Sequence, residues 1–153
     1  MKAIFTLIIA LFATASAMAA PVELNSEVYV ERLQKRADGS VATILEAPKL
    51  VVPGDQLVFV VRYKNAGKQP ASNLSVTNPI PRAVAFSGTA DGTEFVSVDG
   101  GKSWGTLAKL KIGKPDGTFR PALPSDVTHV KWTLNQTLAA GSVGKLVFRG
   151  VVR

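Results

Sequence analysis

Residues 56–64 read QLVFVVRYK, and this stretch decides the fold class. Its odd-numbered positions from Leu57 to Tyr63 are all apolar, and they fall on one face of an extended chain because side chains alternate between the two faces of a strand. The even-numbered positions hold two valines followed by Arg62 and Lys64. The stretch therefore predicts a strand with one face in the core and the other at least half covered.

The same period of two recurs along the chain in short segments that are closed by Gly, Pro, Asn or Asp. No window of a dozen residues keeps a helical stripe, and turn pairs such as Asp38-Gly39 and Asp116-Gly117 follow one another closely. The chain has no cysteine, so apolar burial has to hold the domain. We predict an all-β fold, an immunoglobulin-like β-sandwich of about seven to nine strands. The further strands are expected at residues 27–33, 41–46, 74–77, 83–86, 93–98, 107–112, 130–134 and 146–152.

The first twenty residues have the order of a secretory signal peptide. Lys2 precedes an apolar run, and small residues follow it. The run is shorter than the roughly 20 apolar residues that cross a bilayer, and Ala17 and Ala19 stand at the two positions that signal peptidase reads. We therefore predict a signal peptide at residues 1–19, a single domain at residues 20–153, and export to the periplasm or the cell exterior.

The expected mature domain is basic. Removing the leader takes away only Lys2, so 17 Lys and Arg face 11 Asp and Glu, a net charge of +6. Such a charge favours contact with anionic surfaces, although scattered basic residues also fit an ordinary solvated face. The longest stretch without periodicity, residues 113–125, is the best candidate for a mobile or binding loop. The candidate binding residues in and just before it are Lys109, Lys111, Lys114 and Arg120.

Residues 97–104 read SVDGGKSW and fit the Asp-box pattern of Ser-x-Asp-x-Gly-x-Ser-Trp, which looks like the blade hairpins of sialidases. In such a turn the Asp side chain accepts hydrogen bonds from backbone amides, the glycine takes unusual backbone angles, and the tryptophan packs beneath. One copy in a chain of this length cannot build a propeller. We therefore interpret Ser97, Asp99, Gly101 and Trp104 as a structural turn.

No constellation for catalysis stands out. His129 is the single histidine, so a catalytic triad or a histidine metal cluster is not expected. Asp91, Asp99 and Asp116 each precede a glycine and leave a calcium ion in such a loop as an open alternative. The sequence favours a protein without catalytic residues, cofactor or dedicated metal site.

Three ordered segments resemble a bacterial surface family, the conserved-repeat domain known as domain of unknown function eleven. They are residues 51–67, with Pro-Gly-Asp before an aromatic strand and an Asn-x-Gly turn, residues 74–81, with Asn78 and Pro79 where the family usually has an acidic residue before Ile-Pro, and residues 130–148, which are similar to the family's closing hairpin. The resemblance spans about residues 49–152. It implies an immunoglobulin-like sandwich of the cell envelope or exterior, and no reaction.

The expected function is a non-catalytic envelope or surface module that acts through contacts with an envelope or surface protein. The alternative is a module that binds an anionic polysaccharide or other glycan through the basic residues between Lys109 and Arg120. No nucleic-acid motif is present, and no stretch beyond the leader has the length of a membrane span.

Overall fold

The computed structural model describes residues 21–153, so the predicted signal peptide lies outside the described residues. Within this range the chain forms ten strands and two short 3-10 helices, which confirms the all-β prediction with one strand more than the expected upper number. The strands are β1 (Val22–Lys35), β2 (Val41–Glu46), β3 (Gln56–Asn65), β4 (Leu74–Pro79), β5 (Val84–Thr89), β6 (Phe95–Ser97), β7 (Lys111–Gly113), β8 (Phe119–Pro121), β9 (His129–Leu134) and β10 (Val143–Val152). The 3-10 helices are η1 (Leu107–Lys109) and η2 (Pro124–Asp126).

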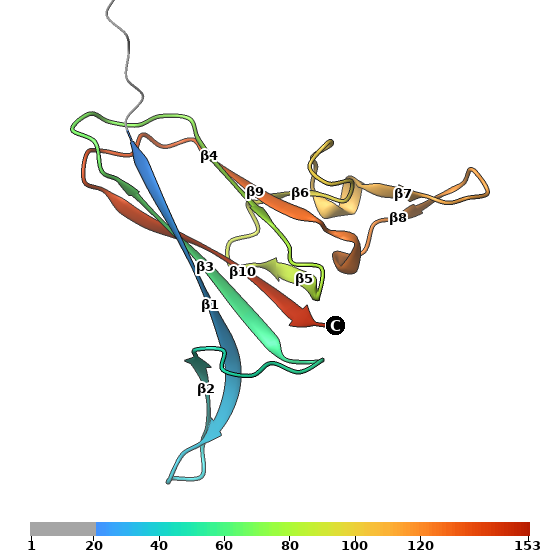
Figure 1. Cartoon of the computed structure of the whole chain (residues 1–153), viewed down its shortest axis with the longest axis horizontal. Helices are drawn as coiled ribbons and strands as arrows, with labels where there is room; N and C mark the ends of the chain where they lie inside the picture. The colour runs from blue at the N-terminus through green and yellow to red at the C-terminus, as the bar shows by residue number, and fades with distance from the viewer. Residues whose placement is uncertain (1–20) are drawn as a thin grey trace, which may run out of the picture.

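Two antiparallel sheets pack against each other (Figure 1). The larger sheet has the strand order β2-β1-β3-β10-β5, and the smaller one has the order β4-β9-β6. The third sheet is the two-stranded hairpin of β7 and β8, which projects from the side of the smaller sheet in Figure 1. β2 and the last part of β1 form a second hairpin that extends beyond the core, and we call it the arm.

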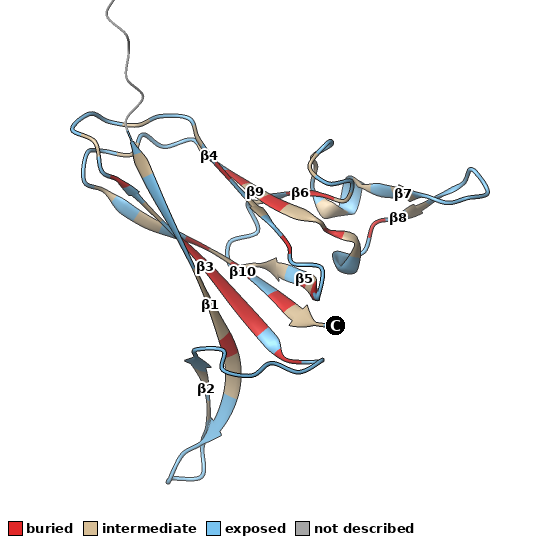
Figure 2. Cartoon of the chain, in the orientation of Figure 1, coloured by how far each residue is buried: buried red, intermediate tan, exposed pale blue. Residues whose placement is uncertain are grey.

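The core lies between the two sheets, where the alternating apolar residues meet. Phe59 of β3 stacks on Phe148 of β10 with ring centroids 4.4 Å apart, and Trp132 of β9 lies 6.2 Å from Phe148. Trp132 is 1% exposed. The buried residues follow β3, β9 and β10 in Figure 2, whereas β2 is exposed or half-buried. The alternation of apolar residues in the sequence therefore correctly predicts which side chains of β3, β9 and β10 face the core.

The outer face of the larger sheet is covered by its own side chains. Val58 and Val60 of β3 point away from the core and are nevertheless buried. Glu27 of β1 pairs with Arg62 of β3 across this face, with 3.2 Å between Oε2 and Nε. Such long side chains shield apolar surface with their aliphatic stems, which explains how a second face without a partner layer stays dry.

Asn65 ends β3 and closes one end of the sandwich. It is fully buried, and its Nδ2 donates to the carbonyl oxygens of Gln69 at 2.8 Å and Leu138 at 2.9 Å. Its Oδ1 accepts from the backbone N–H of Gly67 at 3.0 Å. A buried amide is stable when its hydrogen bonds are made, so Asn65 ties the loop after β3 to the loop before β10.

Two predictions about the segment after residue 106 need correction. Residues 107–112 form η1 and the start of β7 instead of one strand. The stretch 113–125, expected to be an irregular loop, contains β8 and η2. Strands of three residues are too short to show a period, and their pairing is set by the turn at residues 114–118, where the N–H of Lys114 donates to the carbonyl of Thr118 at 2.8 Å.

Candidate functional site

The Asp-box segment forms a turn centred on the Asp99 side chain. Oδ1 of Asp99 accepts from the backbone N–H groups of Lys102 at 3.0 Å and Ser103 at 2.9 Å, and from the hydroxyl of Ser97 at 2.7 Å. Oδ2 accepts from the Ser103 hydroxyl at 2.6 Å. These donors hold the pKa of Asp99 well below its usual range, the Ser103 hydroxyl having the largest effect. Every acceptor oxygen of Asp99 thus has a partner within the turn.

Ser97 and the two glycines complete this turn. The Ser97 side chain is fully buried, and its hydroxyl accepts from the N–H of Gly101 at 2.8 Å. Gly100 and Gly101 have φ of 79° and 88°, a conformation that side chains disfavour. The N–H of Gly100 donates to Oγ1 of Thr128 at 3.1 Å, which links the turn to the start of β9.

Trp104 lies on the outer face of the smaller sheet and is half-buried. Nζ of Lys131 stands 4.2 Å from the centroid of its ring, a cation–π contact. The His129 ring meets Trp104 in an edge-on arrangement with centroids 6.3 Å apart. Because these two β9 residues already engage the indole, Trp104 is not an empty platform for a sugar ring.

The four predicted basic residues fall on different elements. Lys109 ends η1, Lys111 begins β7, Lys114 lies in the turn after β7, and Arg120 is the middle residue of β8. In the ladder Lys111 pairs with Pro121, whereas Arg120 pairs with Ile112. Adjacent pairs point to opposite faces of a hairpin, so Lys111 and Arg120 lie on opposite faces.

Arg120 is engaged by a carboxylate of its own chain. Its guanidinium binds Asp126 of η2 through two contacts, Nη1 to Oδ2 at 2.6 Å and Nη2 to Oδ1 at 2.8 Å. Oδ2 of Asp126 also accepts from the N–H of Leu123 at 2.8 Å. Arg120 is the main cause that lowers the pKa of Asp126 to about 2. A two-pronged pair of this kind fixes geometry, and it gives Arg120 a structural task at the root of the hairpin.

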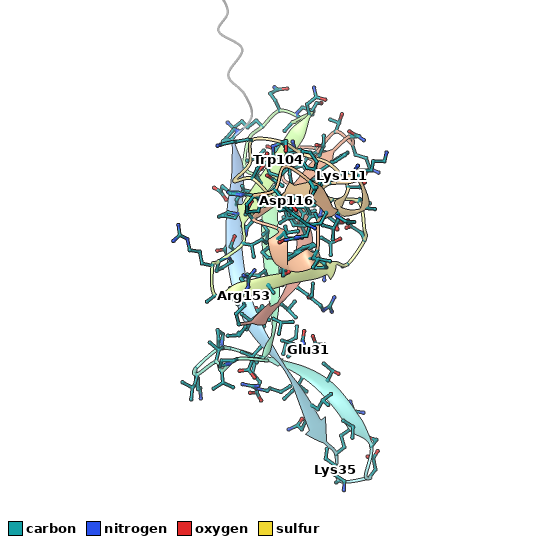
Figure 3. All side chains as sticks on the ribbon, turned by 90° about the vertical axis from the view of Figure 1, so that its right-hand side faces the viewer. Glu31, Lys35, Trp104, Lys111, Asp116 and Arg153 are labelled. Carbon is teal, nitrogen blue, oxygen red and sulfur yellow. The ribbon has the colours of Figure 1, made fainter. Side chains whose placement is uncertain are left out.

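The three lysines lack such partners. Among residues 21–153 no ion pair or side-chain hydrogen bond involves Lys109, Lys111 or Lys114. Phe119 lies on the Lys111 face of the hairpin, opposite Gly113, and is 69% exposed. Sequence reasoning missed Phe119, although an aromatic residue in a stretch without periodicity was a usable signal. Figure 3 shows Lys111 and Asp116 at the same end of the molecule as Trp104.

A second unusual surface lies on the arm. Leu33, Val41 and Leu45 are 77%, 63% and 50% exposed. Leu33 pairs with Thr43, Val41 with Lys35, and Leu45 with Glu31, so the three aliphatic side chains share one face of the ribbon. We call Leu33, Val41 and Leu45 the aliphatic face. In Figure 3 Lys35 marks the free end of the arm, at the opposite end of the view from Trp104.

Chemistry that depends on clustered ligands finds no support in the described residues. Across residues 21–153, no group of three or more His, Cys, Asp or Glu side chains gathers so that it could hold a metal ion. His129 is half-buried, and its Nδ1 lies 3.1 Å from Oγ1 of Thr128. In the same range, no helix has the length and apolar character needed to cross a membrane.

Comparison with known proteins gives no relative: no family model, no curated protein and no solved structure matches the chain.

Proposed function

We propose that this protein is an exported, non-catalytic module of the bacterial cell envelope that acts by binding another protein through the aliphatic face of the arm. The observation that carries the proposal is the exposure of Leu33, Val41 and Leu45 together on a ribbon that extends beyond the core. Contiguous exposed apolar patches on a folded protein mark contact sites.

The rest of the molecule holds the arm at its root, where Arg32 contacts Asp55. Beyond Glu31 the two strands of the arm pair only with each other among the described residues. A two-stranded hairpin is marginal by itself in water, and burying each exposed aliphatic side chain would contribute about 1.5 to 3 kcal/mol. A partner that covers the aliphatic face would therefore both order the arm and gain affinity from it.

The chemistry of this face favours a protein over a charged polymer. Glu31 and Lys35, one of each sign, flank the three aliphatic residues. Arg149 already pairs with Glu31, with 3.6 Å between Nε and Oε2, and Lys35 is the single basic residue among the six paired residues of this face, so a polyanion meets no cluster of cations there. An apolar surface with a polar rim suits a protein partner. The residues that resemble the conserved-repeat family, and the leader-like residues 1–19, support placing this module in the envelope or outside the cell.

The test compares two matched pairs of substitutions in the native bacterium. A photo-crosslinking amino acid at Thr43, which lies beside Leu33 on the aliphatic face, should capture a discrete envelope protein. Leu33→Ser with Val41→Ser should abolish the captured species. Leu123→Ser with Val143→Ser, which removes a leucine that is 53% exposed and a valine that is 72% exposed elsewhere, should leave it unchanged. Capture that is absent in the wild type, or equal in both variants, would refute the arm as the contact surface.

Export is tested on the same protein. The intact mass of the native envelope form should correspond to a chain that begins at Ala20, because Ala17 and Ala19 fit the peptidase positions. A mass that retains Met1 would contradict the proposed leader.

A second candidate function is binding of an anionic polysaccharide by the β7–β8 hairpin. The observation that favours it is that exposed Phe119 shares a face of the hairpin with Lys111, while Lys109 and Lys114 flank β7 and, like Lys111, have no ion-pair partner among residues 21–153. Arg120 is excluded from this set because Asp126 holds its guanidinium. Three lysines and an aromatic ring can contact acidic and flat parts of a sugar polymer, respectively.

This candidate predicts retention on an acidic polysaccharide such as alginate. Replacing Lys109, Lys111 and Lys114 with serine should abolish retention, and salt should weaken it steeply in the wild type. The control replaces Lys64, Lys68 and Lys145, which are also exposed, so that net charge falls equally. Equal losses in the two variants would show that only overall charge is read, and would refute a hairpin site.

A further inference from the structure

The first part of β1 has an open edge. β1 pairs with β3 over residues 22–31 and with β2 only over residues 30–35. Over Val22–Tyr29, no strand of the described residues pairs with the edge that faces away from β3. Exposed edges are usually protected by charged residues, above all lysine, by proline or by a bulge. This segment, VELNSEVY, contains Glu23 and Glu27, the latter paired with Arg62, but neither lysine nor proline, and it pairs with β3 in unbroken register.

The register fixes which backbone groups point outward. The N–H of Ala66 donates to the carbonyl of Pro21 at 3.0 Å, in line with the register that pairs Val22 with Asn65. Hydrogen-bonded pairs alternate along an antiparallel ladder, so the odd-numbered residues of β1 bond to β3. The N–H and C=O groups of Val22, Leu24, Ser26 and Val28 therefore point to the open side.

We propose that a second copy of this chain docks on this edge, with β1 antiparallel to β1 and Ser26 on the two-fold axis. The same edge on both copies supplies donors and acceptors at matching spacing, as an isologous interface requires. Leu24 of one copy then bonds to Val28 of the other, and Ser26 bonds to Ser26. The larger sheets of the two copies join into one continuous sheet.

Side-chain charge selects this register over its neighbour. Centring the axis on Ser26 sets Glu23 against Tyr29 and Asn25 against Glu27. Centring it on Asn25 would set Glu23 against Glu27 twice, and like charges directly opposite each other are destabilising. In the favoured register the Asn25 amide can donate to Glu27, whose Oε2 already accepts from Tyr29 at 2.9 Å.

Apolar contact supports the same register. Leu24 is 53% exposed and borders a hollow of about 890 Å³ that Tyr63 also lines. Leu24 and Val28 share the inner face of β1, because they pair with Tyr63 and Phe59 of β3. In the dimer Val28 of the second copy lies directly opposite Leu24 and covers it. By symmetry Val28 of the first copy covers Leu24 of the second.

The absence of cysteine makes the proposal testable with single substitutions. Ser26→Cys in the purified protein should give a covalent dimer under mild oxidation, because paired residues in a ladder lie within disulfide reach. Ser87→Cys is the matched control, an exposed serine on β5, the strand at the other end of the same sheet. It should stay monomeric on a non-reducing gel. Asn25→Cys reports on the alternative register and should crosslink far less than Ser26→Cys.

Sedimentation of the unmodified protein up to about 1 mM should show a dimer that Ser26→Pro converts to monomer. The N–H of Ser26 points away from β3, so proline there removes an interchain bond without breaking the ladder. Ser26→Lys, which sets two ammonium groups against each other at the axis, should do the same if proline perturbs folding. A monomer at every concentration, equal crosslinking at residues 26 and 87, or preferred crosslinking at residue 25 would overturn the proposal.

This experiment is independent of the proposed function. The aliphatic face lies on residues 33–45, outside the open edge, so the double serine variant of the arm should leave the sedimentation unchanged.

Discussion

Asn65→Ala is expected to lower the free energy of unfolding by about 3 kcal/mol. The substitution removes three hydrogen bonds of a fully buried side chain, to Gln69, Leu138 and Gly67. Each contributes roughly 0.5 to 1.5 kcal/mol net. The Leu138 carbonyl keeps a second donor, the N–H of Ala71 at 2.9 Å, whereas the N–H of Gly67 loses its acceptor. Three bonds at the middle of that range give the expected loss.

Urea unfolding followed by tryptophan fluorescence measures this loss, because Trp132 is buried in the native core. With an m-value of about 2 kcal/mol/M, the midpoint should fall by about 1.5 M. Asn135→Ala is the control, since Asn135 is exposed and makes no side-chain hydrogen bond in the described range. It should stay within about 0.5 kcal/mol of the wild type. If Asn65→Ala lowers the free energy of unfolding by less than about 0.5 kcal/mol, the buried amide does not stabilise the fold through its hydrogen bonds.

The isosteric change Asn65→Asp makes the stability of the variant depend on pH, which gives a second test of the buried amide. A carboxylate at this position would face the carbonyl oxygens of Gln69 and Leu138 without a proton to donate. Burial and the two carbonyls should raise the folded-state pKa of this aspartate above about 3.9. The folded state then binds its proton more tightly, so the variant should lose stability relative to the wild type as pH rises above about 4, and recover it in acid. A pH-independent difference would contradict this account.

Three further outcomes are expected. Asp99→Ala should lower the melting temperature, and the difference from the wild type should shrink in acid, because the pKa of Asp99 is lowered and its contribution disappears as pH falls. Gly144→Ala should destabilise by about 1 to 3 kcal/mol in urea, since a Cβ there would lie 2.2 Å from Cζ of Tyr63. Arg120→Lys should speed amide hydrogen exchange in the β7–β8 hairpin without changing exchange in β3, because lysine cannot form the two-pronged contact with Asp126.

The sequence predicted best the bounds of those strands that show a clear period of two along their length. Residues 41–46 have the predicted bounds, and residues 56–64 extend by a single residue. β2 alternates between exposed and half-buried positions over residues 41–45, and β3 has an apolar residue at every second position, on its inner face, so the period of two marks both strands.

β1 begins five residues before the expected start at residue 27. Val22 and Leu24 alternate with Glu23 and Asn25, but Ser26 interrupts the apolar positions, and pairing with β3 continues across it.

The candidate sites also differ in how far apart in the sequence their contacting residues lie. The Asp-box turn is local, so its residue pattern was enough to predict that backbone amides donate to Asp99. The contacts of the Ser97 and Ser103 hydroxyls with Asp99 were not predicted. The pairing of Arg120 with Asp126 depends on the path of β8 into η2, and no local pattern distinguishes this arginine from its lysine neighbours. The sequence predicted that Leu33 ends a strand at residues 27–33 and made no statement about its exposure. The structure exposes Leu33 because it lies on the outer face of the larger sheet with Glu31, whereas Val30 faces the core.

Each of the two projecting hairpins is fixed at its root by an arginine–aspartate contact of the same kind. Asp55 accepts a two-pronged contact from Arg32 of the arm and the N–H of Val52, three residues before it. Asp126 likewise accepts a two-pronged contact from Arg120 of the β7–β8 hairpin and a hydrogen bond from the N–H of Leu123, three residues before it.

In each case the arginine belongs to the hairpin and the aspartate to the segment that connects it to the core. The arginine keeps the pKa of its aspartate low, so the contact persists at neutral pH. A ribbon that must present side chains to a partner loses affinity if it has to be ordered on binding. Fixing the root limits that loss while the far end of the ribbon stays exposed, and this arrangement suits a module that works through contact.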